Sequence, residues 1–202
     1  MTDTSAFSAA ADARERRTRT AREARLAAAA SDAGLLDVAY TVLDSPAGPL
    51  LAAATPAGVV RIAFACEGHD AELERLAGEV SPRVLRAPAR LDDVARQLDE
   101  YFEGRRHGFD LPMDLALVHG AFRCRVVQHL TRIPYGATES YGTIAGLLDR
   151  PGAARAVGTA CARNPLPIVA ACHRVVRGDG SVGQYAGGSD VKRMLLAMES
   201  GA

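Results

Sequence analysis

Tryptophan is absent from this sequence of 202 residues, and the aromatic residues make up only 5% of it. There is no run of about 18 apolar residues, which excludes a transmembrane helix, and the first residues lack the apolar segment of a secretory signal. The four cysteines form no Cys-x-x-Cys pair, so neither a zinc ribbon nor a thioredoxin-like motif is supported. We therefore expect a cytoplasmic protein with reduced thiols and no contact with a membrane.

A net charge is also absent, because 24 Lys or Arg balance 24 Asp or Glu, but the balance changes along the chain. Residues 37–118 contain 8 Arg and 14 acids, whereas residues 119–202 contain 10 Arg or Lys and 5 acids. A polyanionic partner is therefore expected to meet the second half of the chain. An arbitrary distribution of surface charge explains the same counts equally well.

Residues 1–36 are rich in Ala and Arg, which favour helix, but they lack a stripe of large apolar residues with which a helix could pack. We expect a disordered or loosely helical tail there. In residues 37–115, three short apolar segments separated by SPAG and TPAG predict three strands joined by turns. Apolar residues at helical spacing within 91–102 predict a helix. We interpret residues 37–115 as an N-terminal α/β domain.

Residues 116–202 are predicted to be mostly helical. Residues 122–133 place apolar side chains on one helical face, Ser140 can cap the helix that follows it, and Pro151 is placed to begin a third helix. The last two helices, separated by a tight turn, resemble a helix-turn-helix, although many helical hairpins share this pattern. Three arginines near the second of these helices favour DNA contact: Arg150, Arg155 and Arg163.

The segment 164–176, NPLPIVAACHRVV, is the most unusual part of the sequence. Its two prolines restrict the backbone at the start of the segment, and Cys172, His173 and Arg174 follow an apolar run. A thiol in apolar surroundings is inert unless a base or a cation lies nearby, and the two following residues are of these types. A glycine-rich loop containing Tyr185 comes next, and such loops allow the backbone to approach a ligand closely. From these residues alone, a purely structural Cys-His pair remains the alternative.

The segment ACHRVV closely resembles the Pro-Cys-His-Arg-Val signature of the O6-alkylguanine-DNA alkyltransferases, also called methylated-DNA–protein-cysteine methyltransferases. The segments IPYGATESYGTIA, ARAVGTACARNPLPI, VGQYAGG and VKRMLLAMES resemble further blocks of this family in the same order and spacing. The upstream segment DEYFEGRRHGFDLPMD resembles the link between the family's two domains, and LDSPAGPLLAA resembles its opening strands. The resemblance extends over residues 37–200 and leaves out residues 1–36.

The resemblance implies an α+β fold in two domains. Residues 37–115 would form a small ribonuclease-H-like α/β domain with a three-stranded antiparallel sheet. Residues 116–202 would form a mostly helical, winged helix-turn-helix-like domain that binds DNA and carries the reactive cysteine. The implied function is DNA repair by a monomer that acts on duplex DNA containing O6-alkylguanine. The alkyl group is transferred irreversibly and once to Cys172 after the base is flipped out of the helix. Neither the preferred alkyl size nor activity on O4-alkylthymine can be decided from the sequence.

The resemblance also implies roles for four catalytic residues. Cys172 would accept the alkyl group as a thioether, and His173 would act through a water molecule as the base that produces the thiolate. Glu199 would orient His173. Asn164 would be the hinge between the recognition helix and an active-site strand.

The substrate-binding and DNA-binding residues implied by the resemblance are Tyr141, Arg155, Arg174, Val175, Tyr185 and Ala186. Tyr141 would contact the flipped nucleotide and its phosphate, and Arg155 would enter the base stack in place of the extruded base. The carbonyl groups of Cys172 and Val175 would read the guanine amino group. The segment Tyr185–Ala186 would close the pocket.

The sequence departs from the family pattern at several points. Ala171 stands where the family has proline, which removes a backbone constraint directly before the nucleophile. Ala186 stands where some members have serine. No counterpart is found for the metal-binding domain of some larger members or for the zinc ligands of some animal members, so we expect no metal and no cofactor.

Three other functions are open to a chain of this kind. Alkyltransferase-like lesion sensors bind alkylated DNA without repairing it, but in them the acceptor cysteine is replaced, whereas Cys172 is present here. A helix-turn-helix regulator of transcription gives no reason for Cys172, His173 and Glu199 to occur together. A papain-like or redox thiol enzyme lacks support, because no His and Asn lie at that family's spacing and no resolving cysteine is adjacent.

Overall fold

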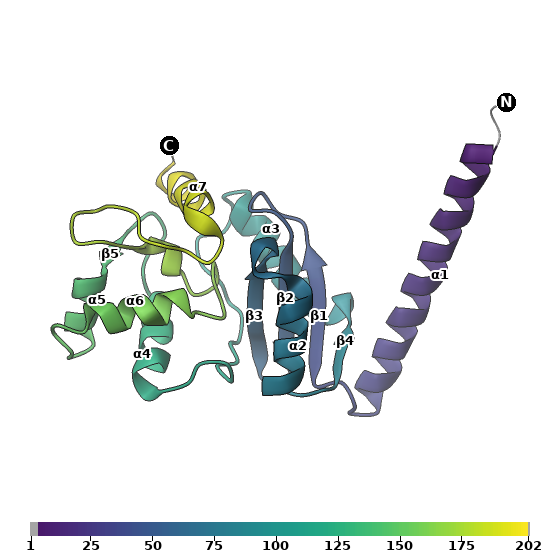
Figure 1. Cartoon of the computed structure of the whole chain (residues 1–202), viewed down its shortest axis with the longest axis horizontal. Helices are drawn as coiled ribbons and strands as arrows, with labels where there is room; N and C mark the ends of the chain where they lie inside the picture. Colours follow the sequence, from purple (N-terminus) through teal and green to yellow (C-terminus); the bar gives the residue numbers. More distant parts are fainter. Residues whose placement is uncertain (1–3, 202) are drawn as a thin grey trace.

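A four-stranded sheet forms the centre of the first half of the chain in the computed structural model, which describes residues 4–201 (Figure 1). Strands β1 (Val38–Leu43), β2 (Leu50–Thr55) and β3 (Gly58–Phe64) run antiparallel to their neighbours. A short strand β4 (Val84–Arg86) pairs in parallel with β1, so that the strand order is β3-β2-β1-β4. The prediction of a three-stranded antiparallel sheet is wrong in this detail. A strand of three residues is too short to produce a recognisable alternation of apolar and polar residues.

Helices cover both faces of this sheet. Helix α2 (His69–Glu79) places Leu76 in a small apolar cluster on one face. Helix α3 (Asp92–Phe102), preceded by the 3-10 turn Pro88–Leu91, packs on the other face, where the apolar cluster continues into the second half of the chain. Because both faces are covered, every residue of β3 is buried, and its sequence GVVRIAF is apolar at every position but one.

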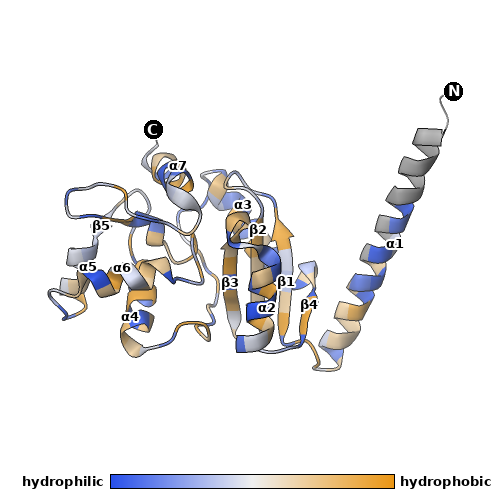
Figure 2. Cartoon of the chain, in the orientation of Figure 1, coloured by the Kyte–Doolittle hydropathy of each residue, from blue (hydrophilic) through white to orange (hydrophobic). Residues whose placement is uncertain are grey.

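Residues 4–32, expected to be a disordered or loosely helical tail, form one helix, α1 (Thr4–Asp32). The helix projects from the edge of the sheet that lies farthest from the second half (Figure 1). Hydrophilic residues recur along its described length, whereas the strands are largely hydrophobic (Figure 2). The C-terminal part of the helix packs against the rest of the domain, where Ala27 is buried and Arg90, in the 3-10 turn before α3, donates a hydrogen bond to Ser31 Oγ at 2.8 Å. Among residues 4–201, no helix combines the length and apolar character needed to cross a bilayer.

The second half is built from short helices, as predicted. Helix α4 (Ala121–Leu130) is followed by the short strand β5 (Glu139–Ser140) and by helix α5 (Tyr141–Leu147). The predicted N-cap is confirmed, because Ser140 Oγ accepts a hydrogen bond from the Thr143 backbone N–H at 3.0 Å. Helix α6 (Ala154–Ala162) begins three residues after Pro151, which lies in the preceding turn instead of starting the helix.

The chain ends with the active-site segment and one more helix. Residues Cys172–Arg174 form a 3-10 turn, strand β6 (Val175–Val176) pairs in parallel with β5, and helix α7 (Gly188–Ser200) closes the domain. The segment predicted to be an active-site strand is therefore a turn at the cysteine itself. The predicted α+β fold, with a sheet domain followed by a helical domain, is confirmed.

The outer edge of β3 joins the two halves. The backbone of Val59 exchanges hydrogen bonds with Pro112 and Asp114 of the connecting segment, each at 2.8 Å. Further along β3, the Ile62 N–H donates to the Pro165 carbonyl oxygen of the second half at 2.9 Å. The edge strand is thus covered by backbone from outside the sheet, which protects it from pairing with other chains.

We predict that alanine at Gly58 will destabilise the protein strongly. Gly58 has a φ of +143°, and a Cβ atom there would lie 2.2 Å from the Pro112 carbonyl oxygen. The combined cost of backbone strain and overpacking should lower the free energy of unfolding by about 3 kcal/mol. The control is Gly48→Ala, because Gly48 has a φ of +86° but open space around it, and backbone strain alone should cost about 1 kcal/mol. Urea unfolding of both variants measures the difference, and equal losses would contradict the close contact.

Candidate active site

Asn164 fixes the position of the Cys172 thiol. Its side-chain amide N–H₂ donates to the Ala170 carbonyl oxygen at 2.8 Å and to Cys172 Sγ at 3.1 Å, and its Oδ1 accepts from the Leu166 N–H at 3.0 Å. Asn164 is buried, and Cys172 is only 3% exposed. The Asn164 side chain therefore connects the backbone two residues after the end of α6 to the thiol.

Two tight turns shape the backbone between Asn164 and Cys172. The Val169 N–H donates to the Pro167 carbonyl oxygen around Ile168, which has a φ of +71°. This conformation is strained for a β-branched residue and costs about 1–3 kcal/mol. The Cys172 N–H donates to the Ala170 carbonyl oxygen around Ala171, with φ −70° and ψ 59°. Since proline imposes a φ near −65°, Ala171 keeps the backbone that a proline would give at this position.

A buried carboxylate, that of Glu199, collects hydrogen bonds from three parts of the chain. Its Oε1 accepts from the Tyr101 hydroxyl at 2.5 Å, from His173 Nε2 at 2.8 Å and from Arg174 Nη2 at 2.8 Å. Its Oε2 accepts from Arg174 Nε at 2.8 Å and from the Gly136 N–H at 3.3 Å. The Glu199 side chain is 1% exposed and that of His173 is fully buried. The predicted contact between Glu199 and His173 is therefore present in the structure.

These contacts set the protonation of His173. Burial alone would raise the pKa of Glu199, but the hydrogen bonds from His173 and Arg174 outweigh it and hold that pKa well below its usual range. Burial lowers the pKa of His173 in spite of the opposing effect of Glu199, so the ring is neutral at pH 7. Because the carboxylate accepts from Nε2, the proton of the neutral ring is on Nε2 and Nδ1 carries the free lone pair. Within the described residues, the buried Nδ1 has no hydrogen-bond partner.

The Cys172 thiol is protonated at rest. Burial raises its pKa to about 11, although the hydrogen bond from Asn164 and the charge of Lys192 act in the opposite direction. Lys192 is fully buried on α7 and donates from Nζ to the Val175 carbonyl oxygen at 2.6 Å. The Val175 carbonyl, predicted to read the guanine amino group, thus has one of its two lone pairs in use.

Tyr141 packs against the glycine-rich loop, and Tyr185 projects from that loop toward His173. A Cβ atom at Gly183 would lie 2.5 Å from the Tyr141 hydroxyl oxygen, so this tyrosine packs directly on the loop backbone. The ring of Tyr185 meets the rings of Phe64 and His173 edge-on, at centroid distances of 5.5 and 6.2 Å. The buried Tyr185 hydroxyl has no partner among the described residues. The structure therefore brings the predicted loop and the predicted base together.

The same loop rests on the first half of the chain. The Cys66 thiol donates to the Ala186 carbonyl oxygen at 3.4 Å, and a Cβ atom at Gly187 would lie 2.9 Å from the Phe64 ring. Phe64 is the last residue of β3, and Cys66 lies in the 3-10 turn that follows it. One wall of the site is thus made by the N-terminal domain.

The two predicted arginines occupy very different places. Arg155 is exposed in the first turn of α6 and forms no salt bridge within the described part of the chain. Arg174 is 5% exposed, and besides Glu199 it binds the Ile133 carbonyl oxygen through Nη1 at 2.6 Å. The prediction that Arg174 contacts DNA does not fit this position, because its donors point into the protein and are already used.

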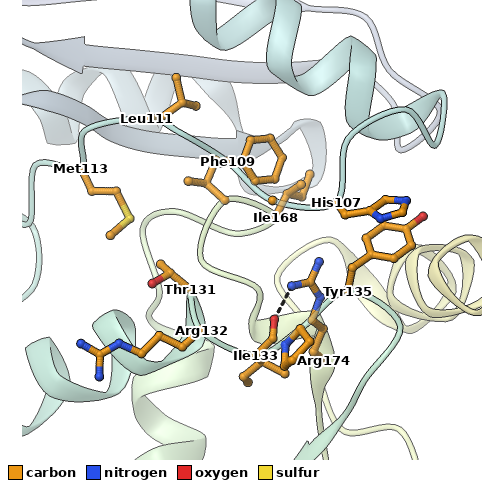
Figure 3. Close-up of a pocket in the computed structure, with 13 residues that line it drawn as sticks. His107, Phe109, Leu111, Met113, Thr131, Arg132, Ile133, Tyr135, Ile168 and Arg174 are labelled. Atoms are coloured by element: carbon orange, nitrogen blue, oxygen red, sulfur yellow. Dashed lines mark hydrogen bonds between the residues drawn. The ribbon is translucent and has the colours of Figure 1, made fainter.

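A cavity of about 290 Å³ lies behind the active-site segment (Figure 3). Residues 107–113 of the connecting segment form one side, residues 131–135 form the other, and Ile168 and Arg174 complete it. His107 stacks on Tyr135 with ring centroids 4.1 Å apart, and the Arg174 guanidinium lies 5.7 Å from the Tyr135 ring centroid. Arg174 lines this cavity, but Cys172 does not.

Two polar members of the site, Tyr101 and Lys192, were missed in the sequence analysis. Both lie on helix faces that the periodicity marks as core. Tyr101 follows Val94 and Leu98 on α3. On α7, one buried face contains Lys192, Leu195 and Glu199. A second charged residue on the same buried face as Glu199 was the signal that could have identified Lys192.

Metal ligands are not gathered anywhere in residues 4–201. No group of three or more His, Cys, Asp or Glu side chains there is placed to hold an ion. The four cysteines are free thiols.

We predict that Glu199→Gln lowers the free energy of unfolding by about 3 kcal/mol at pH 7, because the amide leaves Arg174 buried without a counter-charge. The pKa of Glu199 is lower in the folded state than in the unfolded state. The ionised carboxylate therefore stabilises the folded protein above the unfolded pKa of about 4.3, and this stabilisation is lost as the pH falls below that value toward the folded pKa. Wild-type protein should therefore lose more stability between pH 6 and pH 3 than the variant. The control Glu79→Gln, at an exposed ion pair with Arg75, should cost less than about 1 kcal/mol. Equal losses for both variants in urea would contradict the role of Glu199.

Models of one protein family match both halves of the chain. The family model described as 6-O-methylguanine DNA methyltransferase, ribonuclease-like domain, matches residues 38–115, and the model for the DNA binding domain of the same enzyme matches residues 121–201. A methylated-DNA–protein-cysteine methyltransferase of Methanosarcina barkeri is 38% identical over 160 residues, which cover 79% of this chain and 96% of the relative. One of Mycolicibacterium paratuberculosis is 38% identical over 162 residues, covering 80% of this chain and 92% of the relative.

Solved structures show the same architecture. The crystal structure of the Mycobacterium tuberculosis O6-methylguanine methyltransferase has a TM-score of 0.71 and 35% identity, with 81% of this chain and 93% of the other covered. A structure of M. tuberculosis OGT in complex with DNA has a TM-score of 0.69 at the same identity and coverage. The resemblance found in the sequence is confirmed. With both domain models matched in order and relatives covered over nearly their whole length, the chain belongs to the 6-O-methylguanine DNA methyltransferase family.

Proposed function

We propose that this protein repairs DNA by moving the alkyl group of O6-alkylguanine onto Cys172, in a reaction that each molecule performs once. The observation that carries the proposal is a buried thiol held by Asn164, next to a neutral histidine whose free Nδ1 is oriented by Glu199. A lesion-binding protein without transfer activity is the second candidate. The presence of Cys172 in this setting favours the enzyme.

The proposed reaction begins with loss of the thiol proton. A water molecule passes it to His173 Nδ1, and Glu199 stabilises the imidazolium that forms. Lys192 and Asn164 lower the cost of the thiolate. The sulfur then forms a bond to the alkyl carbon as the carbon–O6 bond breaks. The bonding electrons go to the guanine, which takes up one proton, so the products are guanine and a thioether on Cys172.

The thioether accounts for the single turnover. Hydrolysis would have to break a carbon–sulfur bond at a saturated carbon, and no acyl or phosphoryl group is present for water to attack. Burial also raises the pKa of the Cys172 thiol, which keeps it unreactive toward other electrophiles until a flipped guanine has entered the pocket.

The DNA-binding half of the protein is proposed to be residues 116–202, with residues 37–115 as the supporting domain. Three exposed arginines lie on α6 and in the turns that flank it: Arg150, Arg155 and Arg163. The Arg155 side chain projects from the first turn of α6 and has no intramolecular partner in the described structure. A buried thiol cannot reach a base inside the duplex, so the nucleotide must be flipped out. Arg155 is the proposed side chain that fills the vacated position, and Tyr141 and the Tyr185–Ala186 segment are proposed to line the pocket. The protein is proposed to act as a monomer.

We predict stoichiometric labelling of one residue. After incubation with a duplex that carries one O6-methylguanine with a labelled methyl group, the label should reach about one methyl per protein, all on Cys172 in peptide maps. Cys172→Ala should take up no label. Cys124→Ala is the control and should behave as wild type, because the Cys124 thiol donates a hydrogen bond to the Val118 carbonyl oxygen and takes no part in the proposed reaction. Repeated turnover, label on another cysteine, or tight binding of the lesion without transfer would refute the proposed reaction.

We predict that Arg155→Ala slows repair of duplex DNA roughly 10- to 100-fold, since flipping costs a few kcal/mol. Its reaction with free O6-benzylguanine should keep the wild-type rate, because a free base needs no flipping. Arg193→Ala removes an equal charge from α7, where Arg193 pairs with Asp190, and should change neither rate by more than a small factor. Rates of both variants with both substrates decide the matter, and equal losses on the two substrates for Arg155→Ala would remove it from this role.

A further inference from the structure

Arg61 is a buried cation of the N-terminal domain that reaches the active-site segment of the other domain. Its side chain is 4% exposed and lies on β3. Nη1 donates to the Pro165 carbonyl oxygen at 3.3 Å and to the Ile62 carbonyl oxygen at 3.0 Å. The same Pro165 oxygen also accepts from the Ile62 N–H at 2.9 Å. Two donors from one strand therefore hold a single carbonyl group of the second domain.

That carbonyl belongs to the turn that positions the thiol. Pro165 directly follows Asn164, whose side chain donates to Cys172 Sγ and to the Ala170 carbonyl oxygen. The strained backbone at Ile168 lies in the same segment, so the segment keeps its shape only while contacts on both sides hold it. Arg61 supplies one of these contacts from outside the domain.

Arg61 also controls a negative charge near the thiol. Its Nη2 donates to Glu67 Oε1 and its Nε to Glu72 Oε2, both at 2.6 Å. Glu67 lies in the 3-10 turn after β3, next to Cys66, which contacts the glycine-rich loop. The charge of Glu67 acts to raise the pKa of Cys172. Asn164 donates a hydrogen bond to the same thiol. The titratable groups from other elements that interact with it are Tyr141, Cys161, Tyr185 and Lys192. His173 is the residue that follows Cys172 in the chain.

We propose that Arg61 is a positioning residue for alkyl transfer, acting through the Pro165 carbonyl on the Asn164 turn and through its ion pair with Glu67. The inference rests on the proposed transfer to Cys172 and extends it, because it makes the N-terminal domain part of the reaction apparatus. An arginine suits this task, since its planar group can serve two carboxylates and a carbonyl at once. A lysine at this site keeps the charge but has a single nitrogen for the same partners.

The test uses the full-length protein and free O6-benzylguanine, which needs no DNA binding. Arg61→Met should lower the rate constant of benzyl transfer per folded molecule at least about tenfold at pH 7.5, because small displacements of a nucleophile have large effects on rate. The loss should shrink at higher pH, since the uncompensated charge of Glu67 moves the midpoint of the rate–pH profile upward. Arg61→Lys should lower the rate but leave this midpoint near that of wild type.

Arg83→Met is the matched control. Arg83 forms a bidentate ion pair with Asp37 in the same domain but makes no contact with the active-site segment among the described residues. It should change thermal stability without changing the rate or its pH dependence. If both Arg61 variants lose stability but keep the wild-type rate and profile, Arg61 is merely structural and the inference is wrong. If wild-type protein transfers no benzyl group to Cys172, the proposed function fails and this inference fails with it.

Discussion

The carboxylate of Glu199 is the interaction on which the rest of the site depends. It is almost completely buried near the end of α7 and binds Tyr101 from the first domain, the Gly136 N–H from the loop after α4, and His173 and Arg174 beside the nucleophile. A buried charge is tolerated only when its partners satisfy it. The four partners therefore have to be in place together, and the same contacts that compensate the charge orient His173, the proposed base.

The electrostatics of the site keep the Cys172 thiol protonated and unreactive before the proposed transfer. Burial raises the pKa of Cys172 and holds the thiol in its protonated form, while Asn164 and Lys192 lower the free energy needed to form the thiolate. His173 is neutral for the same reason of burial, which leaves Nδ1 free to accept a proton. We therefore expect the thiol to stay unreactive until a flipped guanine enters the pocket. Ala171, which stands where the family has proline, has a φ of −70°, close to the value that proline imposes.

The N-terminal domain has a larger part in this arrangement than a scaffold attached to a catalytic domain would have. The outer edge of β3 binds the connecting segment and the Pro165 carbonyl, and its last residue, Phe64, packs against the glycine-rich loop. One apolar cluster continues through both halves of the chain. Tyr101 adds a polar contact from the same domain to Glu199. Displacement of either domain would therefore change the surroundings of Cys172, His173 and the glycine-rich loop.

Local patterns in the sequence were sufficient for much of the helical half, because the Ser140 cap and the apolar spacing in α4 depend on neighbours a few residues away. The proposed site residues Cys172, His173, Asn164 and Glu199 came from the resemblance of short segments to a family, and the structure brings them close together. Only the tertiary structure decided the rest. Strand β4 forms because β1 offers it an edge, and Arg174 turns inward because Glu199, 25 residues later in the chain, lies next to it. The positions of Tyr101, Lys192 and Arg61 were equally hidden, since a polar residue on an apolar face is understood only when its buried partner is known, and that partner lies far away in the sequence.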